Sequence, residues 1–549
     1  MEKLNYSEKR CLVIEDRRPF LMLLRGLLTS LGAKKITTES SAEAGLKACK
    51  ANKYDIIVSD LHLGSNKKNG FEFLEELRKH QLIKPSTVFI MISAESGRSM
   101  VLGSIEKQPD DYLIKPFSQA QLNARIARAS VRRATLSALY SQIDHQKYEL
   151  AIQTCRHFLD TEPRYTAHLL KLLVSLYWKL DQFEAAESIL TKILNDRPML
   201  WATCAMAKTK LYLKQYDEAI EIGKKVIQQS VNTVEAYDIV ADAYLASDRK
   251  PEALKYIIDA LAISPLSIDR HFNVCRIARE NQDFELAMSS AKSIFELSQR
   301  SIHKNVNHMC GYVRSILDVA EHTTDKKVKN RFMQETSLTM QRMQRNEEFA
   351  GGKQDDFDFE IFESLIQARM QLLEGKQTEA KRTLEETQIN IEKEFTEYPL
   401  PMATDSLKLM IDMGDYEEAN KLVKLLGDNA DKTDLAIRHL IESELENAKS
   451  KRIAYVRSNK KGIALYSQGN FSEAYQEFTT AKQICPLNIS VNLNLLQSLI
   501  RLVKSTEKPE GRHIQEVREI FRFISSMPLK EIHKQKFQNM HKDAEEIIN

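Results

Sequence analysis

Alanine recurs about every 34 residues through the middle of this 549-residue chain, at Ala151, Ala186, Ala219, Ala253 and Ala287. Four of these alanines have an aromatic residue three positions before them: Tyr148, Phe183, Tyr216 and Phe284. Twelve positions after each alanine comes a residue where the helix is expected to end: Pro163, Pro198, Val231, Pro265 and Gln299. A small residue lets two helices approach closely, and proline ends a helix. A fixed period of this length indicates a unit that packs against copies of itself, so we expect stacked pairs of antiparallel helices.

The pattern resembles tetratricopeptide repeats, which form an α-solenoid whose concave surface binds a peptide or helix of a partner protein. It weakens after residue 300 and returns in "EGKQTEAKRTL" (Ala380), "MGDYEEANKLV" (Ala419) and "GIALYSQGNFSEAYQEFTTAKQICP" (Ala474). Residues 301–360 are helical in pattern but out of register, and "GGKQDDFDF" (351–359) is the predicted flexible joint. The resemblance therefore implies a protein-binding region that spans most of the chain.

The first 130 residues follow a different rule, in which β-rich runs alternate with amphipathic helices. The predicted strands are 11–16, 34–40, 54–60, 87–93 and 111–116, and the predicted helices are 18–32, 41–52, 70–80, about 97–107 and the segment from Ser118. This alternation, with continuous apolar strands, predicts a parallel sheet covered by helices on both faces. The expected fold class is α/β followed by all-α, with a doubly wound, five-stranded, flavodoxin-like sheet and then a solenoid.

Polar side chains follow the predicted strands at the points where they end. Glu15 and Asp16 end the first strand, Asp60 the third, Ser93 the fourth and Lys115 the fifth. Doubly wound sheets hold their sites at the carboxyl ends of the strands. Crowded carboxylates repel one another unless a cation joins them, and Mg²⁺ prefers oxygen ligands. A carboxylate that attacks phosphorus forms an acyl phosphate, whose oxygens Lys115 and Ser93 would bind.

The motifs "VIED", "IIVSD", "MISAES" and "YLIKPF" together resemble the CheY-like receiver domain of bacterial two-component response regulators, over residues 10–130. The resemblance implies that Asp60 is the phosphoacceptor, which receives its phosphoryl group from a sensor histidine kinase or a phosphotransfer protein. It also implies that Asp16 binds Mg²⁺ directly and that Glu15 acts through water. Asp60 and the backbone carbonyl of His62 complete the implied protein ligands.

Four further positions match the family's pattern. Ser93 matches the switch hydroxyl, Tyr112 the switch aromatic residue and Lys115 the phosphoryl-binding lysine. Ala94 is small, as the family requires for access to the phosphoryl group. The bond between Lys115 and Pro116 matches one that is often cis in the family.

The sequence departs from the family in the loop after Asp60. Gly64 stands where the family usually has proline, and the loop "LGSNKKNG", which carries Lys67 and Lys68, is longer than usual. His62 and Glu95 occupy positions that tune dephosphorylation in the family, so the lifetime of the phosphoryl group stays open. We expect a receiver that can be phosphorylated.

The helix after Ser118 is predicted to continue through 123–143 and to join the receiver to the repeats as a stiff connector. Apolar residues recur along it: Leu122, Ile126, Ala129, Leu136 and Tyr140. An alternative is a basic partner surface built from Arg125, Arg128, Arg132 and Arg133. The expected domains are a receiver (1–125), a connector (126–146), a first array (147–300), a helical spacer (301–360) and a C-terminal repeat-like region (361–549).

Composition argues against several classes of function. The chain has 79 basic and 76 acidic residues, a net charge of +3 that gives no electrostatic case for nucleic-acid binding. It contains no apolar run of about 18 residues and no signal-peptide pattern, so we expect no membrane insertion. The cysteines lie far apart without a CxxC pair, which favours free thiols in a reducing cytoplasm: Cys11, Cys49, Cys155, Cys204, Cys275, Cys310 and Cys485.

One motif points falsely to an enzyme. Glu252, Ala253 and Leu254 spell the name of a cyclic-di-GMP phosphodiesterase motif, but Ala253 is a repeat alanine and no metal-binding set of acids accompanies it. We therefore expect no enzymatic activity beyond self-phosphorylation from a phosphodonor and autodephosphorylation.

The leading hypothesis is a bacterial response regulator in which phosphorylation of Asp60 switches a protein-binding repeat surface. In one version, that surface binds another component of the same phosphorelay. The first alternative is a constitutive repeat scaffold in which the receiver is a phosphate sink, and the second is a nucleic-acid-directed regulator. A dimer formed through the receiver also stays open.

Overall fold

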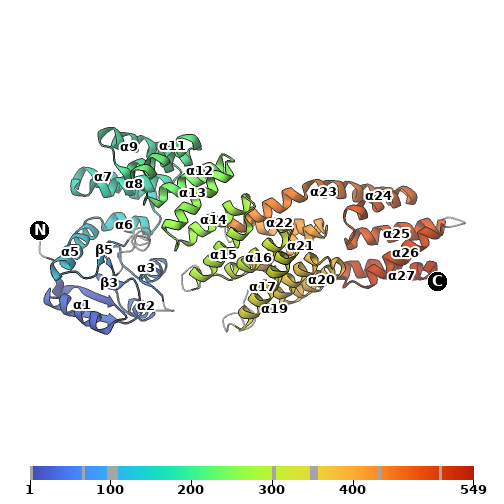
Figure 1. The fold of residues 1–549 in the computed structure, drawn as a ribbon, viewed down its shortest axis with the longest axis horizontal. Coiled ribbons are helices and arrows are strands. Elements are labelled where there is room, and N and C mark those ends of the chain that lie inside the picture. The colour runs from blue at the N-terminus through green and yellow to red at the C-terminus, as the bar shows by residue number, and fades with distance from the viewer. Residues whose placement is uncertain are drawn as a thin grey trace. The chain divides into compact units, whose positions relative to one another are not determined.

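The computed structural model describes residues 4–64, 68–94, 109–299, 304–345, 356–428, 435–505 and 510–548. The chain forms two compact units, Met1–Asn305 and Val306–Asn549 (Figure 1). The predicted helix at 97–107 lies outside the described residues, as do Lys67, Glu95 and positions 351–355 of the predicted joint. Within the described ranges, none of the helices has both the length and the apolar character needed to span a bilayer.

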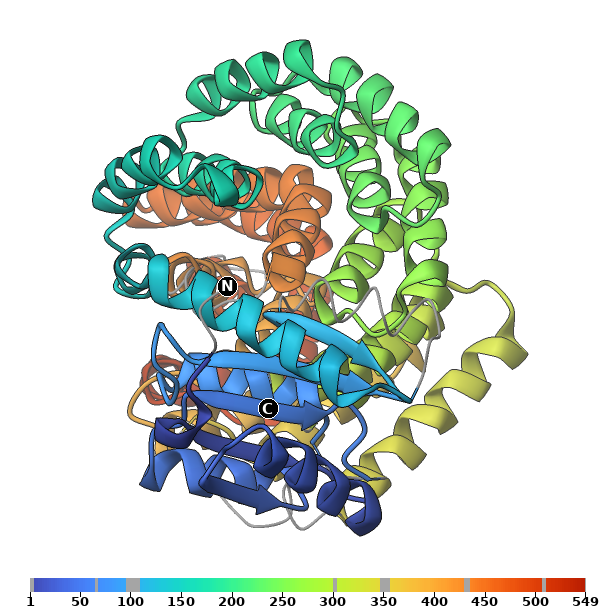
Figure 2. The same ribbon diagram turned by 90° about the vertical axis from the view of Figure 1, so that its left-hand side faces the viewer.

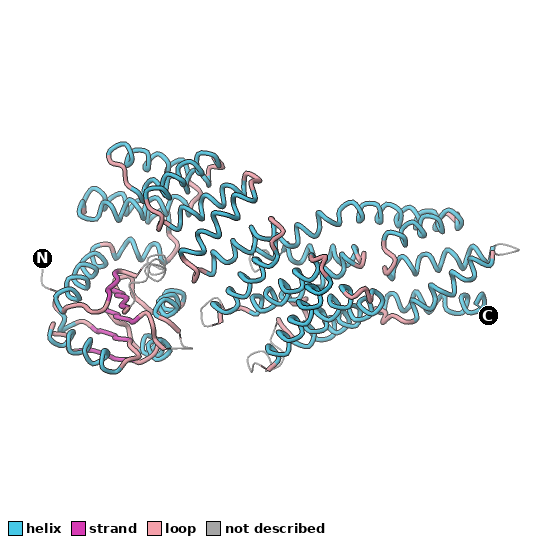
Figure 3. Tube along the Cα trace, viewed as in Figure 1, coloured by secondary structure: helices cyan, strands magenta, loops and turns pink. Residues whose placement is uncertain are grey.

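The first unit begins with the predicted five-stranded parallel sheet, in the order β2-β1-β3-β4-β5. Its strands are drawn in magenta in Figure 3. The strands are β1 (Arg10–Ile14), β2 (Lys35–Glu39), β3 (Ile56–Asp60), β4 (Val88–Ser93) and β5 (Asp111–Ile114). Every residue of β3 and β4 is buried, because these two strands are central and covered on both faces. This arrangement confirms the α/β prediction and explains why both strands are so apolar.

Helices cover the two faces of the sheet and form two separate apolar cores. On one face pack α1 (Arg18–Ser30) and α5 (Gln119–Thr135), and on the other pack α2 (Ala42–Ala51) and α3 (Gly70–Lys79). The N-cap of α2 is Ser41, as its side chain accepts a hydrogen bond from the backbone N–H of Ala44. The two helical layers hold the strand ends at one edge of the sheet.

After the sheet, the first unit continues as helical hairpins that stack in a curved array (Figure 2). The helices are α6 (Ser137–Asp144), α7 (Tyr148–Thr161), α8 (Thr166–Lys179), α9 (Phe183–Asp196), α10 (Leu200–Tyr212), α11 (Tyr216–Gln229), α12 (Val234–Ala246), α13 (Lys250–Ile263), α14 (Ile268–Glu280) and α15 (Phe284–Ser298). Each repeat alanine is the fourth residue of the second helix of its hairpin and is at most 2% exposed. The predicted period therefore corresponds to one hairpin.

The second unit is also helical. Its described helices are α16 (Val306–His322), α17 (Lys326–Gln344), α19 (Phe359–Leu373), α20 (Gln377–Glu394), α21 (Leu400–Asp412), α22 (Tyr416–Asp428), α23 (Leu435–Ser467), α24 (Phe471–Ile484), α25 (Ile489–Ser505), α26 (Gly511–Ser525) and α27 (Glu531–Ile548). Ala380, Ala419 and Ala474 again stand fourth in the second helix of a hairpin and are buried. The hairpin unit of the first array therefore returns here.

The turns of these hairpins share one backbone feature that the sequence did not reveal. In each of the eight hairpins with a repeat alanine, the residue two positions before the second helix has a positive φ: Gln146, Asp181, Lys214, Asp248, Gln282, Gly375, Gly414 and Gly469. Glycine adopts this left-handed conformation without strain, whereas other residues pay a conformational cost. Glycine takes this position in the three such hairpins of the second unit and in none of the five of the first unit.

The predicted single connector helix is wrong in one respect, because the structure divides it at Leu136 into α5 and α6. Leu122 and Ile126 of α5 belong to the core of the sheet domain. Leu136 and Leu139 belong to the core of the first hairpins. Leu136, with a φ of −95° and a ψ of 15°, therefore stands between the helix that packs in the sheet domain and the helix that packs in the hairpins.

All seven cysteines are free and buried. Burial raises the pKa of Cys49 and of Cys155 to about 12. These thiols are therefore protonated near neutral pH and shielded from solvent.

Candidate functional site

The strand order brings the predicted polar residues together at one edge of the sheet. Glu15 and Asp16 follow β1, Asp60 is the last residue of β3, and Ser93 is the last residue of β4. One carboxylate oxygen from each of Glu15, Asp16 and Asp60 lies within 4.8 Å of the others. Glu15 and Asp60 are 0% and 5% exposed, whereas Asp16 is open to solvent. The site therefore has a buried floor and one exposed acid at its rim.

Lys115, which follows β5, reaches across the sheet edge to two of these carboxylates. Its Nζ atom lies 2.8 Å from Oδ2 of Asp60 and 2.7 Å from Oε2 of Glu15. The same ammonium lies 4.0 Å from the centre of the Phe20 ring at the start of α1. Phe20 in turn packs edge-on against Phe117. One lysine cannot balance three carboxylates, so the site keeps a net negative charge when all three are ionised.

The burial and crowding of these carboxylates affect the pKa of Glu15. The pKa of Glu15 is raised to about 7, chiefly by burial and in part by the charge of Asp60, while the hydrogen bond from Lys115 acts in the opposite direction. A raised carboxyl pKa means that the charged form is disfavoured in this cluster. The donors are all oxygen atoms, which suits a hard divalent cation such as Mg²⁺. Among the described residues, no other three Asp, Glu, His or Cys side chains come this close together.

Asp60 is held from the backbone side as well. Its Oδ1 accepts a hydrogen bond of 2.8 Å from the N–H of Leu61, and Leu61 in turn accepts one from the N–H of Gly70 at 2.9 Å. A Cβ atom on Gly70 would lie 2.4 Å from the carbonyl oxygen of Asp60 and 2.7 Å from Sδ of Met91. Gly70 is therefore a site residue that sequence reasoning missed, because only glycine lets the start of α3 approach Asp60 so closely.

The remaining predicted residues lie around this cluster. Ser93 is fully buried, and its carbonyl accepts a hydrogen bond of 2.8 Å from the N–H of Lys115. Ala94 and His62 are exposed at the edge, and Tyr112 is half-buried in β5 against the core formed with α2 and α3. The peptide bond between Lys115 and Pro116 is cis.

The loop after Asp60 follows a course that proline could not take. Gly64 has a φ of +101°, whereas the proline ring fixes φ near −65°. The N–H of Lys68 donates to Oε1 of Glu43, and the Lys68 ammonium pairs with Glu76 of α3. Lys68 is therefore held by carboxylates of α2 and α3 and not by Asp60.

The four arginines of α5 are paired within the domain. Arg125 and Arg128 bind the carboxylate of Asp111 at 3.0 and 2.7 Å. Arg132 and Arg133 bind Asp110 at 3.1 and 2.7 Å. The two aspartates balance half of the charge of the four arginines, and the side chains of Arg125 and Arg128 stay 43% and 59% exposed, so the alternative of a basic partner surface stays open.

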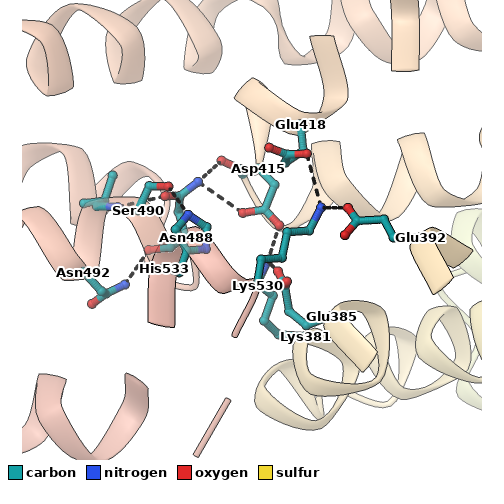
Figure 4. Close-up of polar contacts among 12 residues, drawn as sticks. Lys381, Glu385, Glu392, Asp415, Glu418, Asn488, Ser490, Asn492, Lys530 and His533 are labelled. Atoms are coloured by element: carbon teal, nitrogen blue, oxygen red, sulfur yellow. Dashed lines mark hydrogen bonds and ion pairs between the residues drawn. The ribbon is translucent and has the colours of Figure 1, made fainter. Parts of the chain in front are cut away.

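A second charged cluster lies in the other unit (Figure 4). The ammonium of Lys381 on α20 is fully buried and binds Glu385 at 2.6 Å as well as Asp415. Asn488, before α25, donates to the carboxylate of Asp415 at 3.1 Å. Lys530, before α27, binds Glu392 of α20 at 2.6 Å. The contacts join segments of one unit to one another, so we interpret the cluster as structural.

Comparison with known proteins places the similarity in the sheet domain. Residues 11–127 match the family described as the response regulator receiver domain. The chain is 33% identical over 141 residues to the alkaline phosphatase synthesis transcriptional regulatory protein PhoP of Bacillus subtilis, covering 26% of this chain and 56% of that protein. It is 28% identical over 124 residues to the probable chemotaxis protein CheY of Rhizobium etli, covering 22% of this chain and 94% of that protein.

A solved structure gives a match of similar extent. The BeF3-activated DrrB receiver domain is 26% identical and covers 22% of this chain and 96% of its own, with a TM-score of 0.20. The chain spans about half the length of the first curated relatives that it matches, 56% of one and 48% of the next. What those whole proteins do is therefore not carried over with the similarity.

Proposed function

Because residues 11–127 form a response regulator receiver domain, we propose that Asp60 accepts a phosphoryl group and that the helical hairpins carry the resulting signal to a partner protein. The observation that carries the proposal is the position of the Lys115 ammonium, within 2.8 Å of both Asp60 and Glu15 at a buried strand end. In the proposed step, a carboxylate oxygen of Asp60 forms a bond to phosphorus as the phosphorus–nitrogen bond of the donor's phosphohistidine breaks.

The chain's own residues have separate roles in this step. Asp16, Asp60 and the carbonyl of His62 would hold Mg²⁺, with Glu15 acting through water. The ion would neutralise the acids and withdraw charge from the phosphoryl oxygens. Lys115 would exchange its bond to Asp60 for one to a phosphoryl oxygen, and the Ser93 hydroxyl would donate to another. Ala94 leaves space for the incoming group, and Tyr112 would respond to the new position of Ser93.

The proposed output is protein binding by tetratricopeptide-type hairpins. The support is the recurrence of one hairpin geometry, with a buried alanine at the fourth position of the second helix in both units. Stacked hairpins offer an extended surface that a peptide or helix can occupy. A protein of the same phosphorelay is one such partner, and the cytoplasm is the expected compartment.

Phosphorylation is tested on the purified full-length protein with Mg²⁺ and acetyl phosphate. We expect intact-protein mass spectrometry to show one phosphoryl adduct in the wild type and none in Asp60→Asn. An adduct of equal yield in Asp60→Asn would contradict the assignment of the phosphoacceptor.

The output is tested by recovering bound proteins with beryllofluoride, a phosphoryl mimic, present. We expect the wild type to recover a partner in an amount that Asp60→Asn does not match. Equal recovery by both proteins would favour the constitutive scaffold. Binding to nucleic acid that falls steeply with salt would instead favour a nucleic-acid-directed regulator.

A further inference from the structure

The short strand β5 connects two charged sites. Its carboxyl end leads into Lys115, which binds Asp60 and Glu15. Its amino end begins at Asp110 and Asp111, which bind the four arginines of α5. Asp110 and Lys115 are five positions apart in the chain, a span of roughly 17 Å in an extended strand. A shift of β5 at the phosphoacceptor site therefore reaches the arginine contacts over a short and regular segment.

Arg133 contacts several groups beyond its own aspartate, and the neighbouring Arg132 also interacts with the side chain of Tyr140. Its Nε donates to Asp110 at 2.7 Å, and one terminal nitrogen donates to the carbonyl of Pro85, before β4, at 3.2 Å. Its guanidinium carbon lies 4.4 Å from the centre of the Tyr140 ring on α6. The side chain is only 18% exposed, and that of Asp110 only 3%. Arg133 thus joins the sheet domain to the first helix of the hairpin array.

Tyr140 extends this chain of contacts into the next hairpin. Its hydroxyl lies 2.7 Å from Nε2 of His168 on α8. The helix that carries Tyr140 is anchored in the array, since Leu136 and Leu139 are fully buried in the core of the first hairpins. A displacement of Tyr140 therefore moves α6 together with the first hairpins rather than a loose side chain.

We propose that Arg133 couples the phosphoacceptor site to the hairpin array through Asp110 on one side and Tyr140 and His168 on the other. The inference rests on the proposed function, because it assumes that phosphorylation of Asp60 draws Lys115 and β5 to a new position. The array then follows, because Arg133 holds α6 to the start of β5. Phosphorylation of Asp60 can shift the array from one position to another only if the free-energy difference between those positions is not the same in the two receiver states.

Hydrogen exchange of the full-length protein, with and without Mg²⁺ and beryllofluoride, tests the coupling. In the wild type, we expect the mimic to change exchange rates at least threefold in peptides from the site (56–64 and 109–118) and from α6 and α8 (137–179). In Arg133→Ala, we expect the change at the site to remain and the change in α6 and α8 to be lost. Arg125→Ala is the matched control. Arg125 pairs with Asp111, whereas Arg133 pairs with Asp110 and packs on the ring of Tyr140, so Arg125→Ala should behave as the wild type.

A second variant keeps the test valid if Arg133→Ala unfolds locally. Tyr140→Phe keeps the ring beneath Arg133 but removes the hydroxyl that contacts His168, so the mimic should still change exchange in α6 and change it less in α8. Retention of the full wild-type response in α6 and α8 of Arg133→Ala would overturn the coupling. So would a wild-type response confined to the site peptides, which would leave the proposed function intact. If the mimic changes no peptide of the wild type, the proposed function itself fails.

Discussion

The Nζ atom of Lys115 and the Oδ2 atom of Asp60 lie 2.8 Å apart, although 55 positions separate the two residues in the chain. The contact crosses the end of β4, which lies between β3 and β5 in the sheet. The lysine side chain is 13% exposed and that of Asp60 is 8% exposed, so water screens the pair only weakly. A cation is therefore already in place where a phosphoryl group would add negative charge.

Replacing this cation should slow phosphorylation. We expect Lys115→Met to reduce the rate of adduct formation from acetyl phosphate on the order of 100-fold, because it removes a preorganised positive charge at the reacting oxygen. The measurement is a time course of intact mass with Mg²⁺ present. Lys68→Met is the control, since Lys68 pairs with Glu76 and not with Asp60. A wild-type rate in Lys115→Met would show that the ammonium does not act in the step.

Adding one methyl group at Gly70 should destabilise the sheet domain. Gly70→Ala would place Cβ 2.4 Å from the carbonyl oxygen of Asp60, so the start of α3 must move, at a cost of about 1–3 kcal/mol in the free energy of unfolding. Gly26→Ala is the control. Gly26 lies within α1 with no heavy atom near its Cβ position, so alanine should stabilise the helix by about 0.5–1 kcal/mol. Urea denaturation measures both, and equal stability of the two variants would refute the close approach.

The neutral state of His168 should make the first unit sensitive to mild acid. The pKa of His168 is lowered to about 4, chiefly by burial and in part by the charges of Arg132 and Arg133. Below the ordinary histidine pKa of about 6.5, His168 binds a proton in the unfolded chain but stays neutral in the folded chain. The contribution of this neutral form to the free energy of unfolding is therefore fully present above about pH 6.5 and is lost as the pH falls towards 4.

We therefore expect His168→Gln to lose less thermal stability than the wild type between pH 7 and pH 5. Differential scanning calorimetry at several pH values measures the slope. His145→Gln is the control, because His145 is exposed at the end of α6 and its removal should leave the wild-type slope. Equal slopes for the wild type and His168→Gln would contradict the assignment.

Removing the buried cation of the second unit should be costly. Lys381→Met removes the ammonium that Glu385 and Asp415 share, which we expect to lower the free energy of unfolding by about 3–5 kcal/mol. Adding Asp415→Asn removes one unpaired charge and should recover part of the loss. Lys376→Met, at a 54% exposed side chain, should change stability by no more than about 0.5 kcal/mol. A Lys381→Met protein as stable as Lys376→Met would show that the cluster contributes little.

The sheet and its polar edge could be predicted because local patterns determine them. Apolar strands of the correct length, separated by helices, leave few possible topologies, and the carboxyl ends of such strands lie at one edge. The buried alanines were predictable for a related reason, since a fixed spacing repeats the same packing demand in every hairpin.

The features that the sequence did not reveal all depend on contacts between distant segments. Leu122, Ile126 and Leu136 fit one helical stripe, and the sequence does not show that Leu136 packs in a different core from the other two. The sequence does not show that the arginines of α5 are paired, because their partners, Asp110 and Asp111, become neighbours only through the position of β5. Gly70 was unremarked because its role depends on the carbonyl of Asp60, across a long loop.

The burial of all seven cysteines makes the chain suited to thiol-directed labelling. With every native thiol shielded, a single cysteine introduced at an exposed position such as Val231, which is 60% exposed, would react selectively with a maleimide dye. A second introduced cysteine on the exposed surface of α1 would then allow energy transfer between the sheet domain and the hairpins to be followed as Asp60 is loaded. No native cysteine would have to be replaced before such a measurement.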